Sequence, residues 1–341
     1  MVTFKSSCCL VSILIIVVAI NLQTNDLFLV QHDNKLISKK ISLDEPIIAD
    51  HTIMNLVRTD QIPDQAINMS KNVLHIAYGH TSHGSQIISG MTGLSSFKES
   101  NGGSIGLYAW NEGGTDGALD IDDDFVSGDL GNPDRITWSN GTRDYLDNPS
   151  NSDVNVVMWS WCGQASSATV SDIDLYLSLM NDLENDYPGV NFVYMTGHTD
   201  GSGLTGNLHQ RNNQIRNYCQ TNNKILYDFE DIELYDPDLA YFGDKNVTDN
   251  CDYTGGNWAT EWQNTHTENV DWYSCSSAHS QALNANQKAY AIWWLWAKLS
   301  GWDSNSTQQT STTQETSGFT LLILSVTLSL LVVMKRRNNR K

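Results

Sequence analysis

Four short apolar runs, each long enough for one strand and each followed by polar residues, constrain the fold of this chain most. They span residues 73–78, 154–160, 191–196 and 224–227. Between them, apolar residues recur at three- and four-residue steps over 170–183 and, more weakly, over 208–219, and a last helical pattern covers 282–300. Buried strands that alternate with amphipathic helices predict an α/β domain, with helices on both faces of a doubly wound, mostly parallel sheet in three layers.

Two regions interrupt this alternation. Residues 102–151 are rich in Gly, Asp and Asn and are expected to form long loop insertions, which in α/β proteins gather where the ligand binds. Residues 235–273 form a second insertion that could wall one side of a cleft. The domain is expected over 72–302, with 22–71 as an N-terminal arm that packs on it and brings His51 toward the cleft.

The two ends of the chain predict a cell-surface location. A 13-residue apolar run, 8–20, follows Lys5 and predicts a signal peptide or an uncleaved signal anchor over 1–21. At the other end, a Ser/Thr/Gln-rich stalk (303–317) leads to an apolar segment (318–334) and a basic tail (335–341). This arrangement predicts a membrane anchor with its tail inside. It also resembles the sorting signals that archaeosortase-like or sortase-like enzymes process, and either outcome leaves the domain outside the cell.

The charge distribution excludes strongly anionic partners. All 39 acidic residues lie between the two apolar ends, against 14 of the 20 basic residues, so this part carries a net charge of −25. Such a surface repels nucleic acid and anionic lipid. Solubility at a crowded cell surface accounts for the charge, and the membrane is expected to be contacted only through the C-terminal segment.

Four cysteines lie in the part expected outside the cell: Cys162, Cys219, Cys251 and Cys275. An even count in an oxidising compartment suggests disulfides, and a Cys251–Cys275 bridge would close a loop that has few apolar residues. Sequons at 68, 140, 246 and 305 are compatible with glycosylation.

The residues that follow each predicted strand are unusually polar. In an open parallel sheet, the ligand crevice lies at the carboxyl ends of the strands, so these residues should converge there. They are His80, Ser82 and His83 after the first strand, Cys162 and Gln164 after the second, His198 and Asp200 after the third, and Asp228 and Asp231 after the fourth. His279 comes immediately before the last helix.

This order resembles the SGNH or GDSL-like hydrolases, a flavodoxin-like esterase family, over about residues 70–300. The run His-Thr-Ser-His-Gly at 80–84 is similar to the His-x-Ser-x-Gly form of the family's first block. VVMWSWCGQ is similar to the third block, and the run from Ser277 to Trp293 resembles the final block. The resemblance implies Ser82 as nucleophile, His279 as base and Gln164 in place of an oxyanion-binding Asn.

The chain also departs from the family pattern. The Asp expected three residues before the catalytic histidine is Ser276 here. Asp228 is the first candidate to orient His279, with Asp231, Asp271 or a Ser-His dyad as the alternatives. Gly131 is the choice for the second-block glycine.

These residues would support acyl transfer to water without a cofactor or a metal. His279 would take the proton of Ser82, while Gln164 and the backbone N–H groups of Ser82 and Gly131 would hold the oxyanion. The expected substrate is a carbohydrate or other ester, with acetyl groups on glycans as the best single choice. Residues expected to contact it are His80, His83, His198, Asp200, Trp110 and Trp258.

Each assignment has an alternative. Ser82 could cap the following helix, Ser85 is a rival nucleophile, and Cys162 could be a catalytic thiol or a buried one. The histidines at 80, 83, 198, 209 and 279 with Asp200 could instead form the metal site of a phosphoesterase or amidase, although their spacing matches no compact zinc pattern. A third possibility is a carbohydrate-binding surface module without catalysis.

Overall fold

A computed structural model of the chain describes residues 43–303. The expected signal segment, most of the stalk, the membrane segment and the basic tail lie outside these residues. Within the described part, no helix is long and apolar enough to cross a membrane.

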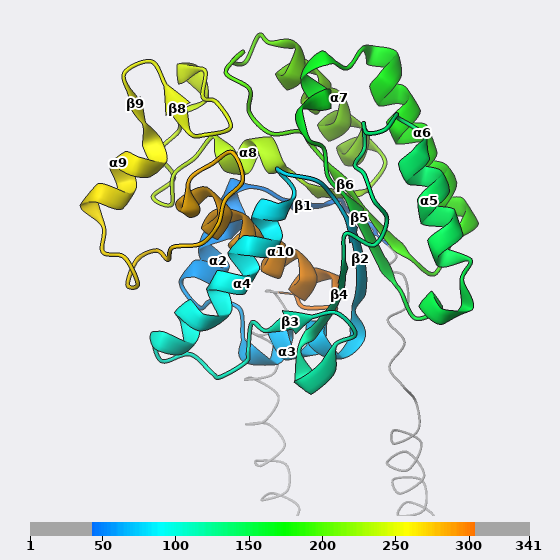
Figure 1. Cartoon of the computed structure of the whole chain (residues 1–341), viewed down its shortest axis with the longest axis horizontal. Helices are drawn as coiled ribbons and strands as arrows, with labels where there is room; N and C mark the ends of the chain where they lie inside the picture. The colour runs from blue at the N-terminus through cyan, green and yellow to red at the C-terminus, as the bar shows by residue number, and fades with distance from the viewer. Residues whose placement is uncertain (1–42, 304–341) are drawn as a thin grey trace, which may run out of the picture. The chain divides into compact units, whose positions relative to one another are not determined.

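A seven-stranded parallel sheet organises the described residues (Figure 1). Its order is β1-β7-β6-β5-β2-β4-β3. The strands are β1 (Ile47–Ala49), β2 (His75–Gly79), β3 (Trp110–Asn111), β4 (Leu119–Asp123), β5 (Val156–Trp159), β6 (Asn191–Met195) and β7 (Ile225–Tyr227). The inner order β4-β2-β5-β6-β7 is the flavodoxin-like order, extended by one strand at each edge. The predicted doubly wound α/β fold is therefore confirmed.

Helices cover both faces of the sheet, as Figure 1 shows. One face packs against α2 (Met54–Arg58), α3 (Asp64–Val73), α4 (Ser85–Ser100) and α10 (Ala282–Leu299). The other packs against α5 (Thr137–Leu146), α6 (Val170–Asp186) and α7 (Asn207–Thr221). Alternate strand residues point to opposite faces, so Ile76 and Tyr78 enter the first core, and Ala77 enters the second.

The remaining elements are short and lie in the connections. They are η1 (His51–Ile53), η2 (Thr115–Gly117), η3 (Pro149–Asn151), η4 (Gly163–Ser167), α8 (Phe229–Glu233) and η5 (Gly243–Lys245). The insertion before α10 contains a two-stranded antiparallel sheet of β8 (Asp252–Tyr253) and β9 (Gly256–Asn257), followed by α9 (Trp258–Thr265).

Three expectations about the organisation need correction. Residues 102–151 are not only loops, because they contain β3, β4 and α5. The described part of the expected N-terminal arm belongs to the domain, since β1 pairs with β7 along the sheet edge. The Cys251–Cys275 disulfide is absent: all four described cysteines are free, and the Cys251 thiol faces Ser280 while the Cys275 thiol faces Ala282 and Asn286.

One glycine permits the close pairing of the two central strands. Gly79 of β2 lies opposite Trp159 of β5 in the parallel register. A Cβ atom at Gly79 would lie 2.3 Å from Cε3 of the Trp159 ring, which is buried and donates a 2.9 Å hydrogen bond to Thr142 Oγ1. The missing side chain at Gly79 therefore leaves the space that the Trp159 ring fills.

We expect the substitution Gly79→Ala to lower the free energy of unfolding by about 1–3 kcal/mol, because an extra methyl group overpacks a filled core. Gly189→Ala is the matched control, since a Cβ there would meet nothing within 4 Å. Urea denaturation of both variants measures the difference. Equal stability of the two variants would contradict this account of the strand pair.

Candidate functional site

The site lies where the winding of the sheet reverses. From β2 the chain passes to β4 on one side and then to β5 on the other, so the crevice at the carboxyl ends of β2 and β5 is the topological switch point. The turn after β2 carries His83, and Cys162 follows β5. Gly84 allows this turn to approach β5, because a Cβ there would lie 2.2 Å from Ser160 Oγ.

Cys162, His83 and Asp249 form a connected triad. His83 Nδ1 lies 3.2 Å from Cys162 Sγ, and His83 Nε2 lies 3.0 Å from Asp249 Oδ2. Because a carboxylate only accepts hydrogen bonds at neutral pH, Nε2 carries a proton and Nδ1 faces the sulfur. His83 is buried, whereas Cys162 and Asp249 are half-buried. This is the arrangement of nucleophile, base and orienting acid that activates a thiol.

Electrostatics favour the ion pair of thiolate and imidazolium. The hydrogen bond from His83 outweighs burial and lowers the pKa of Cys162 to about 7. Burial lowers the pKa of His83, but the bonds to Asp249 and Cys162 outweigh it and raise that pKa to about 9. Between these two values, the sulfur is largely ionised and the imidazole is largely protonated.

Two further imidazoles stack on His83. The His198 ring is parallel to it at 3.7 Å between centroids, and the His279 ring lies at 4.5 Å. His198 is buried with 7% exposure, and its Nδ1 lies 2.7 Å from the Thr199 carbonyl oxygen. His279 is exposed and has a φ of 63°, in the loop before α10.

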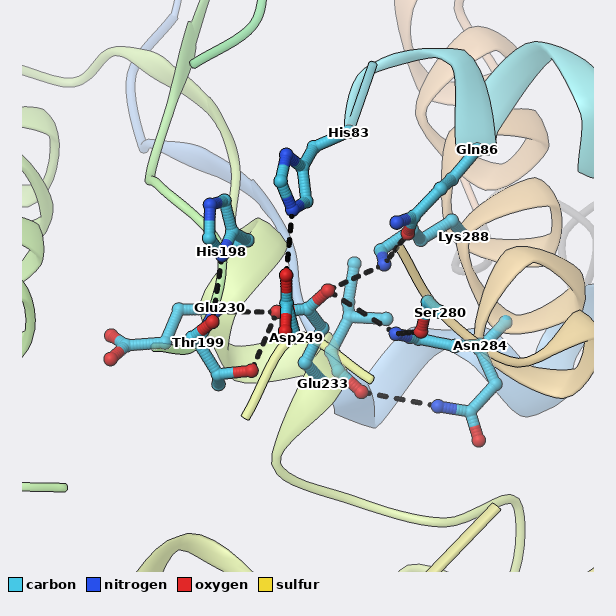
Figure 2. A network of polar contacts seen from close by, with 12 residues as sticks. His83, Gln86, His198, Thr199, Glu230, Glu233, Asp249, Ser280, Asn284 and Lys288 are labelled. Atoms are coloured by element: carbon cyan, nitrogen blue, oxygen red, sulfur yellow. Dashed lines mark hydrogen bonds and ion pairs between the residues drawn. The ribbon is translucent and has the colours of Figure 1, made fainter. Parts of the chain in front are cut away.

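A buried polar network lies beside these rings (Figure 2). Glu233 Oε2 accepts hydrogen bonds from the Thr199 N–H and hydroxyl at 2.6 and 3.0 Å. Its other oxygen, Oε1, lies 2.7 Å from Lys288 Nζ and 3.2 Å from Asn284 Nδ2. Lys288 also donates to Gln86 Oε1, so the network joins α4, α8 and α10 to the turn that carries His198.

The expected oxyanion residues gather around Asp129, which sequence reasoning did not single out. The Gly131 N–H donates to Asp129 Oδ1 at 2.8 Å, so this donor is already used. Gln164 Nε2 lies 3.3 Å from Asp129 Oδ2, and Gln164 Oε1 accepts from the Cys162 N–H at 3.2 Å. An amide nitrogen carries two hydrogens, so Gln164 Nε2 retains one hydrogen beyond its bond to Asp129.

The predicted nucleophile Ser82 is adjacent to His83 in sequence but lies apart from the contacts among Cys162, His83 and Asp249. Its side chain is exposed, and within residues 43–303 it makes no hydrogen bond to His279 or to another imidazole. Its carbonyl oxygen accepts from the Ser85 hydroxyl, the rival nucleophile, at 2.6 Å. The structure therefore brings His83, Cys162, His198 and His279 together, but it does not join Ser82 to a base.

Other predicted site residues have different partners. Asp228 does not orient His279: it is buried and binds Arg216 through both carboxylate oxygens at 2.6 and 2.7 Å. The alternative orienters are also engaged, Asp231 with His51 at 2.6 Å and Asp271 with the Thr267 N–H at 2.8 Å.

Among the residues expected to contact the substrate, the tryptophans pack in or against a core, and two of the polar residues bind neighbouring side chains or backbone. Trp258 is 1% exposed and belongs to the core under the 235–273 insertion, so it is not a stacking surface. Trp110 is half-buried and packs against the main core. His80 lies 2.7 Å from Asp123, and Asp200 accepts from the Ser202 N–H at 2.9 Å.

Among residues 43–303, two groups of side chains are close enough to hold a metal ion. In each of the groups His83, Asp249, His279 and Asp50, His51, Asp231, the candidate ligand atoms lie within 4.8 Å of one another. A direct histidine–aspartate hydrogen bond joins two members of each group, His83 with Asp249 at 3.0 Å and His51 with Asp231 at 2.6 Å.

Sequence reasoning missed Asp249, Glu233 and Lys288. Asp249 lies in an insertion with many Asp and Asn residues, where nothing in the local pattern separates it from its neighbours. The sequence does distinguish Lys288. It is the one charged residue within the first fifteen residues of the otherwise apolar and amide-rich helix 282–299. A lysine there must be buried and paired.

Comparisons with known proteins add little to this geometry. No family model matches the chain, and no curated protein matches it. A solved structure of a presumed acylhydrolase from Bacteroides fragilis NCTC 9343 is similar over 49% of this chain and 72% of its own, at 11% identity and a TM-score of 0.27.

We expect Cys162 to react with iodoacetamide at a rate that rises with pH and levels off above an apparent pKa near 7, the value that His83 imposes on the thiol. His83→Gln removes the cation, so the midpoint should move toward 9, the pKa of an unperturbed thiol. Alkylation followed by peptide mapping measures both profiles. An unchanged midpoint in the variant would show that His83 does not activate the thiol.

Proposed function

We propose that this protein is an acyl hydrolase whose nucleophile is Cys162, with His83 as acid and base and Asp249 as the residue that orients His83. The contact that carries the proposal is the 3.2 Å approach of His83 Nδ1 to Cys162 Sγ at the switch point of the sheet. With the thiol pKa at about 7, about half of the sulfur is thiolate at pH 7.

The first step is attack of the Cys162 thiolate on the acyl carbon. The His83 imidazolium then gives its Nδ1 proton to the departing oxygen, which leaves as an alcohol, and the acyl group remains on sulfur as a thioester. Asp249 holds the ring in the orientation that directs Nδ1 at the sulfur. The free N–H of Gln164 is the proposed donor to the oxyanion.

Ester groups on surface glycans are the proposed substrates, at the outer face of the cell. The terminal apolar segments and the strongly acidic intervening chain support this location. The free state of the four described cysteines leaves the Cys162 thiol available.

We expect the substitution Cys162→Ala to lower the rate of p-nitrophenyl acetate hydrolysis by roughly 10³-fold or more, because it removes the proposed nucleophile. Ser82→Ala is the matched control and should retain activity, since its hydroxyl has no base. Initial rates measure both, and intact mass spectrometry detects the acetyl adduct on wild-type protein.

Two outcomes would replace this mechanism. Loss of activity in Ser82→Ala with retention in Cys162→Ala would establish the serine mechanism. Activity that survives in Cys162→Ala but is lost with EDTA and restored by zinc would favour a metal at His83, Asp249 and His279.

The oxyanion assignment gives a separate expectation. Gln164→Ala should lower kcat by about 10²–10³-fold with little change in KM, because the donor acts on charge that develops in the transition state. Alkylation of Cys162 by iodoacetamide forms no oxyanion and serves as the control. A parallel fall in the alkylation rate would show that Gln164 acts by positioning Cys162 instead.

A further inference from the structure

His198 is a buried imidazole that the first half of the proposed reaction does not use. Its Nε2 atom is buried and has no hydrogen-bond partner among the described residues. The ring is 93% buried, since its exposure is 7%, and it lies face to face with His83 at 3.7 Å and 6°. A buried polar atom without a partner is costly, so its presence beside a reactive pair indicates a group that binds there during the reaction.

The hydrogen bond of the other ring nitrogen fixes the state of Nε2. A backbone carbonyl can only accept, so His198 Nδ1 must donate its hydrogen to the Thr199 oxygen at 2.7 Å. Burial lowers the pKa of His198 and favours the neutral ring. In that ring Nε2 carries a lone pair and no hydrogen, which is the form of a general base.

The buried network holds this tautomer in place. Glu233 fixes Thr199 through both its N–H and its hydroxyl, and Lys288 fixes Glu233. Glu233 and Lys288 are 1% and 0% exposed. Removal of one partner of such a pair leaves an uncompensated buried charge, so the pair confines the Thr199 turn to one arrangement. The carbonyl that orients His198 is therefore held by a rigid part of the fold (Figure 2).

The environments of His83 and His198 differ in a way that separates acid from base. His83 lies between a carboxylate and a thiolate, which favour its protonated form. One nitrogen of His198 donates to a carbonyl group, and the other has no hydrogen-bond partner within residues 43–303. Adjacent titratable groups held in opposite states are how active sites divide proton transfers between two residues.

We propose that His198 is the base of the second half-reaction, which rests on the function proposed above: its Nε2 takes a proton from the water that attacks the acyl group on Cys162. The water oxygen bonds to the acyl carbon, the C–S bond breaks and the sulfur leaves as thiolate. The carboxylic acid formed gives its proton to His83 Nδ1, which restores the ion pair, and His198 releases its proton to solvent.

Two substitutions separate this role from a structural one. His198→Asn places an amide N–H where Nδ1 was, so it keeps the bond to Thr199 and loses Nε2. His198→Gln places an amide group near the position of Nε2, so it can accept a hydrogen bond but is not basic. Stopped-flow release of p-nitrophenol from p-nitrophenyl acetate gives the burst and the steady-state rate, and intact mass spectrometry gives the fraction of acetylated protein.

We expect both variants to keep the burst amplitude of wild type, to lose about 10²-fold in steady-state rate and to accumulate acetyl-Cys162. Wild-type turnover in His198→Asn would overturn the proposal. Wild-type turnover in His198→Gln alone would also overturn it, because position 198 would then need only a hydrogen-bond acceptor and not a base. An equal fall in the rate of the burst phase and in the steady-state rate would overturn this role and place His198 in the acylation step instead. Absence of any acetyl adduct on Cys162 in wild type and in both variants would overturn the proposed function and, with it, this inference.

Discussion

The parallel pairing of β2 with β5 is the constraint on which the site depends. These strands are neighbours in space but are separated in the chain by β3, β4 and α5. Gly79 permits the pairing, since the Trp159 ring fills the space of its missing side chain. Their carboxyl ends then place the turn with His83 next to the turn with Cys162. The register of the two strands brings His83 Nδ1 to 3.2 Å from Cys162 Sγ, and this contact lowers the pKa of the thiol to about 7.

Three stacked imidazoles illustrate how position sets chemistry. His83, His198 and His279 have the same side chain and lie in contact, yet each has a different environment. His83 is bounded by a carboxylate and a sulfur, His198 is buried with one ring nitrogen on a carbonyl group, and His279 is exposed to solvent. Because a histidine responds to small changes in its surroundings near neutral pH, one cluster can hold a proton donor and a proton acceptor together.

Sequence reasoning predicted the fold class and the strands β2, β5, β6 and β7 of the sheet. Apolar runs identified β2, β5, β6 and β7, and three- and four-residue periodicity identified α6 and α10. It missed β4, whose sequence Leu-Asp-Ile-Asp-Asp alternates apolar and acidic residues, because this strand has no continuous apolar run and lies between Gly-rich segments. It placed His83, Cys162 and His198 at one sheet edge and chose Ser82 as the nucleophile, where the contacts led us to propose Cys162. Which of two adjacent side chains turns inward depends on the turn after β2, and Asp249 arrives from a segment with no periodic pattern.

The β1–β7 pairing has a consequence for the order in which the fold is completed. β1 is the first described strand in the chain, but its partner β7 begins at Ile225. At a synthesis rate of about 5–20 residues per second, the two strands leave the ribosome roughly 10–40 seconds apart. During that interval the backbone N–H and C=O groups of β1 have no sheet to join, and β7 itself presents an open edge until β1 docks. The β1–β7 pairing can therefore form only after the last strand of the seven-stranded sheet has been synthesised, and it joins that strand to the first.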